Sequence, residues 1–272
     1  METCNILGVN IAVTNMKETV EFLQDNLESI KGNYICVSNV HTTVMSYEDE
    51  DYRKIQNGGV LALPDGKPLS SYSRKKGFPN AERVTGPDLM YEIFKISEEK
   101  GYRHYFYGST DDTLDLMKEK LLERFPKLQI AGIYSPPFRK EAVKEDQEVI
   151  DMINETKPDF LWVGLGAPKQ ERWMYLNRNR VNALMLGVGA GFDYCADKIQ
   201  RAPKWMQKAS LEWLYRLMQD PKRLFKRYYE TNKKFIYLTK FKAKNKMKKV
   251  CDEMDKKKCS DNITAGAHKA NV

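Results

Sequence analysis

Short apolar runs that alternate with turns and helix-compatible segments dominate this sequence. Residues 160–163 (Phe-Leu-Trp-Val) and 183–186 (Ala-Leu-Met-Leu) are two such runs, and each leads into a turn that contains glycines. Continuous apolar runs of this length are typical of strands buried on both faces of a parallel sheet. Because parallel strands are joined by helical crossovers, this alternation restricts the chain to an α/β fold.

The same alternation covers most of the chain. Further strands are predicted at 34–37, 60–63, 104–107 and 129–134. Helices are predicted at 43–53, 89–100, 108–125, 145–156 and 172–180. Residues 5–13 predict a hairpin around Gly8 and Asn10, Thr14 is the predicted cap of the next helix, and 70–87 is predicted as turns. We therefore expect a Rossmann-like, doubly wound sheet with helices on both faces over residues 1–203.

Positive charge is concentrated in one segment. The formal net charge is +8, but residues 198–258 contain twenty Lys and Arg against six Asp and Glu, so this segment carries +14 and the rest −6. Residues 204–245 combine helical periodicity with aromatic and basic side chains, and Pro221 is predicted to separate two helices. We expect a basic helical appendage over 204–250 that meets an anionic partner, then a disordered polar tail over 251–272.

Composition argues against several classes of protein. No run approaches the ~18 apolar residues that a membrane span needs, and the first residues lack the basic and apolar regions of a signal peptide. Five cysteines without a CxxC pair, together with three scattered histidines, predict a reduced, cytoplasmic protein without a structural zinc site.

Polar residues follow two of the predicted strands. Asp65 comes shortly after the run 60–63, and Asn39 follows the run 34–37. Gly66, next to Asp65, is a candidate substrate-binding residue. A carboxylate at this edge of a sheet can take a proton from a substrate hydroxyl, and an asparagine amide can bind a substrate. Pro-Asp-Gly is also a common turn sequence and asparagine a common helix cap, so both structural interpretations stay open.

Two glycine turns are candidate ligand-binding loops. The residues of interest are Gly164, Gly166, Lys169 and Gln170 in the first turn, and Gly187, Gly189, Gly191 and Asp193 in the second. Neither turn has the spacing of a dinucleotide site or of a P-loop, which disfavours an NAD-dependent enzyme. Glycines admit a close backbone approach and a helix start suits phosphate, so the turns predict a nucleotide-diphosphate cradle. Asp193 either binds a nucleoside hydroxyl or base, or caps a helix.

Arginines are the predicted partners of that diphosphate. The candidates are Arg83, Arg139, Arg201, Arg216, Arg223 and Arg227. No Asp-x-Asp pair follows a predicted strand, so we expect cations and helix N-termini, rather than a divalent metal, to stabilise a phosphate leaving group. The sequence thus predicts neither a metal site nor a cofactor.

In combination, these motifs resemble the WecG/TagA/CpsF family of bacterial glycosyltransferases (glycosyltransferase family 26). The matching segments keep the family's order and comprise Ile-Leu-Gly-Val (6–9), Asn39, Leu-Pro-Asp-Gly (63–66), Arg-Val-Thr-Gly-Pro-Asp-Leu-Met (83–90), Ser-Pro-Pro-Phe-Arg (135–139), Val-Gly-Leu-Gly-Ala-Pro-Lys-Gln-Glu (163–171), Arg-Ala-Pro (201–203), Leu-Glu-Trp-Leu-Tyr-Arg-Leu (211–217) and Pro-Lys-Arg (221–223). The two longest strings are far more specific than a lone glycine motif.

The resemblance implies an inverting, metal-independent transferase at the inner face of the cell membrane. Such an enzyme moves a sugar from a UDP-sugar to a polyprenyl-diphosphate-linked saccharide, for teichoic acid, capsule or exopolysaccharide. Donors in the family include N-acetylmannosamine, its uronic acid and glucose.

The resemblance also implies roles for individual residues. Asp65 is the base, and the other residues of the catalytic site are Asn39, Gln170 and Arg83. Basic residues of the appendage complete the site, namely Arg216, Arg223 and Arg227, with Lys226 competing with Arg227. Asp197 departs from the family, in which glycine is frequent at this place, and the departure bears on the local turn and on donor choice.

Alternatives stay open for the basic helices. Basic helices interleaved with aromatic residues can track the phosphates of a nucleic acid, although this segment begins where the enzyme-like domain stops. The helices can also pack on the domain or at the interface of a homo-oligomer. We favour docking on an anionic membrane surface, without a nucleic-acid partner, because aromatic rings and long basic side chains suit that interface.

Overall fold

A mostly parallel sheet forms the centre of the protein. The computed structural model describes residues 1–209 and 211–242, so the end of the predicted appendage and the predicted tail lie outside the described residues. The strands are β1 Thr3–Ile6, β2 Val9–Ala12, β3 Tyr34–Ser38, β4 Leu61–Pro64, β5 Arg103–Gly108, β6 Gln129–Tyr134, β7 Phe160–Gly164 and β8 Leu184–Gly187. They form one sheet of eight strands in the order β1-β2-β4-β3-β8-β7-β5-β6. β1 and β2 are antiparallel, and all other neighbours are parallel.

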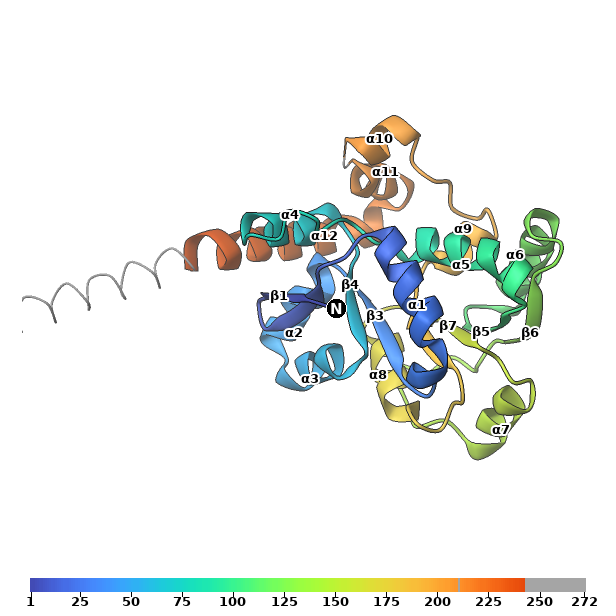
Figure 1. Cartoon of the computed structure of the whole chain (residues 1–272). Coiled ribbons are helices and arrows are strands. Elements are labelled where there is room, and N and C mark those ends of the chain that lie inside the picture. The colour runs from blue at the N-terminus through green and yellow to red at the C-terminus, as the bar shows by residue number, and fades with distance from the viewer. Residues whose placement is uncertain (210, 243–272) are drawn as a thin grey trace, which may run out of the picture.

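Helices cover both faces of this sheet, as predicted (Figure 1). The helices of one face are α1 Met16–Ile30, α5 Gly86–Lys100, α6 Asp111–Arg124 and α9 Gly191–Cys195. Those of the other face are α3 Glu50–Gly58, α7 Gln147–Glu155 and α8 Lys169–Asn177. Alternate residues of β7 serve the two cores, since Phe160 and Trp162 join the first and Leu161 and Val163 the second. The Rossmann-like α/β fold predicted from the sequence is therefore confirmed.

Some local predictions need correction. Asn15, not Thr14, caps α1, because its side chain accepts a hydrogen bond from the Glu18 backbone at 3.0 Å while Thr14 is buried. The helix predicted over 43–53 is two helices, α2 Val40–Glu48 and α3, which meet at Asp49. α4 Lys67–Lys75 begins after Gly66 and extends into the segment 70–87, which was predicted as turns. These positions depend on tertiary burial, which local sequence does not reveal.

The C-terminal helices leave the sheet layers. They are α10 Lys204–Lys208, α11 Glu212–Gln219 and α12 Pro221–Ile236, followed by a π-helical turn at Tyr237–Lys242. Figure 1 shows α10 and α11 standing apart from the sheet. α12 packs against α2, and its Phe235 is buried in a third apolar cluster with Val44 of α2 and Leu69 of α4. Pro221 separates α11 from α12, as predicted.

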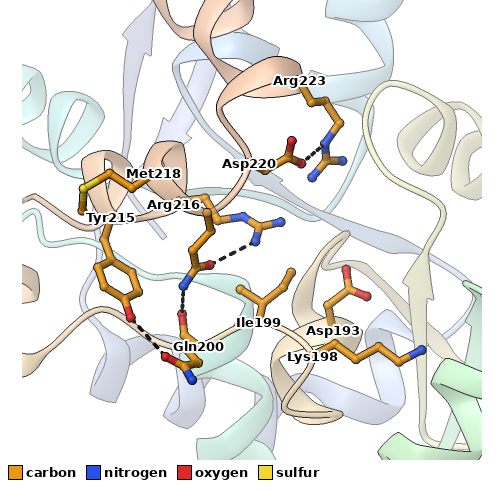
Figure 2. Close-up of a pocket in the computed structure, with 10 residues that line it drawn as sticks. Asp193, Lys198, Ile199, Gln200, Tyr215, Arg216, Met218, Asp220 and Arg223 are labelled. Carbon is orange, nitrogen blue, oxygen red and sulfur yellow. Dashed lines mark hydrogen bonds and ion pairs between the residues drawn. The ribbon is translucent and has the colours of Figure 1, made fainter.

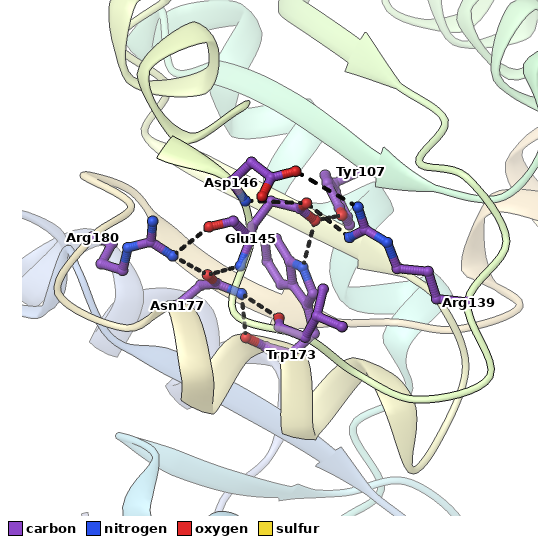
Figure 3. Close-up of polar contacts among 8 residues, drawn as sticks. Tyr107, Arg139, Glu145, Asp146, Trp173, Asn177 and Arg180 are labelled. Atoms are coloured by element: carbon purple, nitrogen blue, oxygen red, sulfur yellow. Dashed lines mark hydrogen bonds and ion pairs between the residues drawn. The ribbon is translucent and has the colours of Figure 1, made fainter. Parts of the chain in front are cut away.

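A buried carboxylate anchors the long connection between β6 and α7 (Figure 3). Glu145 accepts hydrogen bonds from Tyr107 of β5 and from Trp173 Nε1 of α8, the latter at 3.1 Å. Arg139 donates to its other oxygen at 2.8 Å, and Asn177 Oδ1 accepts from its backbone N–H at 2.9 Å. The connection is thereby fixed to both a strand and the helix that follows the first glycine turn.

Replacing Glu145 by Gln is expected to destabilise the fold by about 1–3 kcal/mol at pH 7, because buried charged hydrogen bonds are lost. Burial by itself raises the pKa of Glu145, but the hydrogen bonds from Tyr107, Arg139 and Trp173 outweigh burial and hold it below 4.5. A depressed carboxyl pKa stabilises the fold above the unfolded-state value and loses that effect in acid. The difference between wild type and variant in urea unfolding should therefore shrink from pH 7 to pH 3. The exposed Glu141→Gln is the control, and an equal effect of both variants would refute the anchoring role.

Candidate active site

The candidate site lies at the edge of the sheet where the parallel strands end. Asp65 follows β4, Asn39 follows β3, and the two glycine turns follow β8 and β7, which are the next strands in the sheet. Register keeps these ends level, since Ser38 pairs with Pro64 and Val163 with Gly187. Four segments that are distant in sequence therefore meet along one edge, where α/β proteins bind their ligands.

Asp65 is held between two neighbouring segments of backbone. Its N–H donates to the carbonyl of Ser38 at 2.7 Å. The Val84 N–H donates to the carbonyl of Pro64 at 2.9 Å, so Arg83 lies beside the Asp65 turn. Gly66, the next residue, has a φ of +102°, a conformation in which glycine is favoured. Its place is thus explained by the turn that begins α4.

Asp65 has an unusual proton affinity for a carboxyl group. Burial is the main cause that raises its pKa, to about 7, although part of its side chain remains accessible. The carboxylates of Glu212 and Asp88 also raise its pKa, whereas the guanidinium groups of Arg83 and Arg201 lower it. A carboxyl group with a pKa near neutrality is suited to general base catalysis.

Two arginines and two acids form a cluster beside Asp65. Arg83 donates to Glu212 at 2.6 Å, and Arg201 donates to Asp88 at 2.8 Å. Arg201 also pairs with Glu212 at 3.3 Å. The cluster joins three parts of the chain, because Asp88 lies on α5, Arg201 follows α9 and Glu212 lies on α11. Arg83, predicted as a catalytic residue, is therefore brought to Asp65 but is paired with Glu212.

Asn39 caps α2. Its side-chain oxygen accepts hydrogen bonds from the N–H groups of His41 at 3.0 Å and Thr42 at 3.2 Å. Within the described part of the chain its amide nitrogen has no hydrogen-bond partner. Both interpretations of this residue are thus compatible with the geometry, because the oxygen serves the helix while the amide nitrogen can donate to a ligand.

Gln170 connects the two glycine turns. Its Oε1 accepts a hydrogen bond from the Gly166 N–H at 3.1 Å, and its Nε2 donates to Glu171 at 2.9 Å. A methyl group at Gly187 would lie 3.0 Å from Nε2, and one at Gly189 would lie 3.5 Å from Oε1. Gln170 is itself buried, so its first role is to fix the distance between the turns.

The two glycines of the first turn differ in their surroundings. A methyl group at Gly164 would lie 2.6 Å from the ring of Phe192, so packing requires this glycine. At Gly166, φ is +78° and a methyl group would meet no atom within 4 Å, so the backbone there is open to a ligand. Lys169 at the end of the turn donates to the Arg139 carbonyl at 2.9 Å and so holds the neighbouring connection.

An open cavity of about 640 Å³ adjoins the second glycine turn (Figure 2). Three of the predicted binding residues line it, Asp193 of α9, Arg216 of α11 and Arg223 of α12. Lys198 and Tyr215, which sequence reasoning missed, line it as well. Burial raises the pKa of Asp193, and the charges of Arg216, Lys198 and Arg223 oppose this. The cavity therefore combines several cations with the carboxyl groups of Asp193 and Asp220, the latter paired with Arg223 at 2.5 Å. This setting suits an anionic ligand with hydroxyl or amide groups.

Arg227 lies apart from this cavity. It faces α2. Burial of the His41 imidazole on this helix is the main cause that lowers its pKa, and the positive charge of Arg227 lowers it further. Arg227 Nε and His41 Nδ1 are both buried without a hydrogen-bond partner among the residues described. The structure thus brings Arg216 and Arg223 together and places Arg227 beside the start of the Asn39-capped helix.

Comparison with known proteins identifies the family. The sequence model of the Glycosyl transferase WecG/TagA/CpsF family matches residues 4–249. The chain belongs to the WecG/TagA/CpsF family. This glycosyltransferase family membership confirms the resemblance seen in the motifs and favours an enzyme over a nucleic-acid-binding protein.

Three relatives of the chain share one name, N-acetylglucosaminyldiphosphoundecaprenol N-acetyl-beta-D-mannosaminyltransferase. The protein of Staphylococcus aureus strain MW2 is 28% identical over 223 residues, which cover 81% of this chain and 86% of the relative. That of Bacillus subtilis strain 168 is 29% identical over 223 residues, covering 81% and 85%. That of Bacillus spizizenii is 29% identical over 225 residues, covering 82% and 86%. The similarity thus extends over most of each chain.

Two further properties concern the described residues alone. None of their helices combines the length and the apolar character that crossing a membrane requires. Among the described residues, no group of three or more His, Cys, Asp and Glu side chains is arranged so that it could hold a metal ion.

Replacing Gly164 by Ala is expected to destabilise the fold by about 1–3 kcal/mol, the usual cost of overpacking a core, because the added methyl group meets the buried Phe192 ring. Gly86→Ala is the matched control, since a methyl group there lies at an ordinary 3.4 Å from Val188. Urea unfolding of the two variants at neutral pH measures the difference. Equal stability of both would show that Gly164 is not kept for packing.

Proposed function

We propose that this protein is an inverting transferase that moves an N-acetylmannosamine-type or glucose-type sugar from a UDP-sugar to a polyprenyl-diphosphate-linked saccharide. The observation that carries the proposal is Asp65, whose pKa is raised to about 7 at a strand end beside arginines. Family membership supports transfer of a glycosyl group. The relatives' shared name supports a lipid-diphosphate acceptor that bears N-acetylglucosamine and a product of cell-surface polysaccharide synthesis, such as teichoic acid.

In this proposal the cavity receives the nucleotide diphosphate. Arg216 and Arg223 face it from the appendage, and Lys198 faces it from the catalytic body. The backbone around Gly166 and Gly189 approaches the sugar end of the donor, and Asp193 contacts the nucleoside. Guanidinium and ammonium groups then neutralise the charge that develops on the leaving UDP, so we propose that no divalent metal is needed.

Asp65 supplies the base. Its carboxylate takes the proton of the acceptor hydroxyl while that oxygen forms a bond to the anomeric carbon of the donor. The bond between this carbon and the β-phosphate oxygen breaks, and UDP leaves with the electron pair. Attack from the side opposite UDP inverts the anomeric configuration. In this proposal Asn39 and Arg83 orient the two substrates.

The test is a UDP-release assay in which the protein is given different UDP-sugars with a synthetic polyprenyl-diphosphate-N-acetylglucosamine. Release with one donor, unaffected by EDTA, is expected. Loss of activity in EDTA that Mg²⁺ or Mn²⁺ restores would contradict metal independence, and failure with every donor would contradict the proposed reaction. A salt-dependent gel shift with generic DNA, in the absence of UDP release, would favour the nucleic-acid alternative.

Replacing Asp65 by Asn is expected to lower turnover by about 10²–10⁴-fold, the range typical of a lost general base. The base must be ionised, so wild-type turnover should rise with pH to a plateau above about pH 7, where the pKa of Asp65 lies. Because this pKa is raised on folding, ionising Asp65 destabilises the fold, and Asp65→Asn should be at least as stable as wild type at pH 8. Thermal unfolding and UDP binding are the controls. Turnover close to wild type would reject Asp65 as the base.

The appendage is proposed to dock the enzyme, as a cytoplasmic peripheral protein, on the anionic inner face of the membrane. Phe225 and Tyr229 of α12 stack on each other and are 63% and 60% exposed. They lie one helical turn apart, and Lys222, Lys226 and Lys233 lie on the same side of the helix by spacing. Aromatic rings flanked by lysines are suited to the interface of an anionic leaflet.

The double variant Phe225→Ser, Tyr229→Ser is expected to lower partitioning onto vesicles of phosphatidylglycerol and phosphatidylcholine by about tenfold or more, because burying one such ring contributes about 1.5–3 kcal/mol. Leu122→Ser, which removes an exposed apolar side chain from α6, is the matched control. Cosedimentation measures both, and pure phosphatidylcholine vesicles isolate the electrostatic part. Unchanged binding of the double variant would leave the alternative that this face packs in a homo-oligomer, which sedimentation velocity detects.

A further inference from the structure

Helix α11 forms one wall of the cavity without fully burying any side chain. All eight of its residues lie in the described part of the chain, and none of them is buried. Trp213 and Met218 are largely exposed. Hydrophobic burial, which holds most helices on a domain, is only partial here, at Leu214, Tyr215 and Leu217. Polar contacts therefore contribute to holding this wall.

Glu212 makes the strongest of these contacts. Its carboxylate accepts a hydrogen bond from Arg83 at 2.6 Å and pairs with Arg201 at 3.3 Å, and its side chain is only 18% exposed. The other polar contacts of α11 with the body join exposed groups, Tyr215 to Gln200 at 3.3 Å and Gln219 to the Gln200 carbonyl at 3.1 Å. A partly buried carboxylate with two arginine partners contributes more to holding α11 on the body than exposed hydrogen bonds of this length do.

The partners of Glu212 are themselves fixed beside Asp65. Arg83 precedes Val84, whose N–H is bonded to the carbonyl of Pro64. Arg201 is held by Asp88, and Arg83 lies 4.0 Å from the same carboxylate. Glu212 therefore joins the appendage to the part of the body that carries the proposed base.

We propose that Glu212 is a positioning residue of the transferase, which docks α11 through Arg83 and Arg201 and thereby sets Arg216 in the donor cavity. This inference rests on the proposed function. Arg216 lies one helical turn after Glu212 on the same helix, so a displacement of Glu212 also displaces Arg216, which lines the cavity. Tyr194 supports this arrangement, since the guanidinium groups of Arg201 and Arg216 lie 5.4 Å and 5.9 Å from its ring centroid.

Glu212 also acts on Asp65 through its charge. The charged groups that act on Asp65 are Arg83, Glu212, Asp88 and Arg201, and of these the carboxylates raise its pKa. Removing the negative charge of Glu212 leaves the positive charges of Arg83 and Arg201 opposed by Asp88 alone, so the pKa of Asp65 should fall. The acid limb of the pH–rate profile should then move to lower pH.

The test compares Glu212→Gln with Glu230→Gln, which makes the same change of charge on an exposed residue of α12. Glu212→Gln is expected to lower kcat/KM for the UDP-sugar by about 10–100-fold, because a misplacement of ~1 Å at a positioning group costs that much. Its acid limb is expected to shift to lower pH. Glu212→Asp, which keeps the charge, should retain the wild-type limb while recovering part of the activity.

Hydrogen exchange of residues 212–219 measures docking without any substrate. Exchange there is expected to be faster in Glu212→Gln than in wild type and in Glu230→Gln. Unchanged exchange, or reduced turnover with an unmoved acid limb, would overturn the proposal. A wild-type protein that releases no UDP from any donor would instead refute the proposed function, and exchange would still decide whether Glu212 docks the helix.

Discussion

Parallel pairing of neighbouring strands is the constraint on which the site depends. From β2 to β6 across the sheet all strands point the same way, so their ends lie along one edge. The residues that follow β4, β3, β8 and β7 are therefore neighbours in space although 39 and 189 are far apart in the chain. Gln170 fixes the spacing of the two glycine turns at this edge. Residues that are far apart in the sequence can share a site at this edge, because the order of the strands in the sheet brings them together.

The turn near Asp197 shows how a residue other than glycine is accommodated in a left-handed backbone conformation. Asp197 has a φ of +56°, in the left-handed region where glycine is favoured. Its carboxylate is paired with Arg124 of α6, which also donates to the Cys195 carbonyl at 3.3 Å. An aspartate can therefore adopt this conformation here because a partner on the neighbouring helix offsets part of the backbone strain. The turn keeps a glycine-like backbone and continues into the Lys198 side of the cavity.

Much of the fold was predictable from sequence because burial on both faces leaves continuous apolar runs. The run at 160–163 was found for this reason and is part of β7. Asp65, Asn39 and the glycine turns were predicted because strand ends are visible in the sequence. Glu212 was not, since its partner Arg83 lies 129 residues away and ion pairs leave no local pattern. α4 was not predicted for a related reason, because its buried Leu69 and Ser73 lie among basic surface residues in the sequence.

The exposed character of α11 has a consequence for how the enzyme exchanges its substrates. Because no side chain of α11 is fully buried, displacing this helix would expose less apolar surface to water than displacing a helix of the sheet layers. Opening then costs mainly ion pairs, which are weakened by salt and by competing phosphates, and the apolar cores of the sheet stay intact. The forces that keep the sheet layers folded thus differ from those that hold α11 beside the cavity.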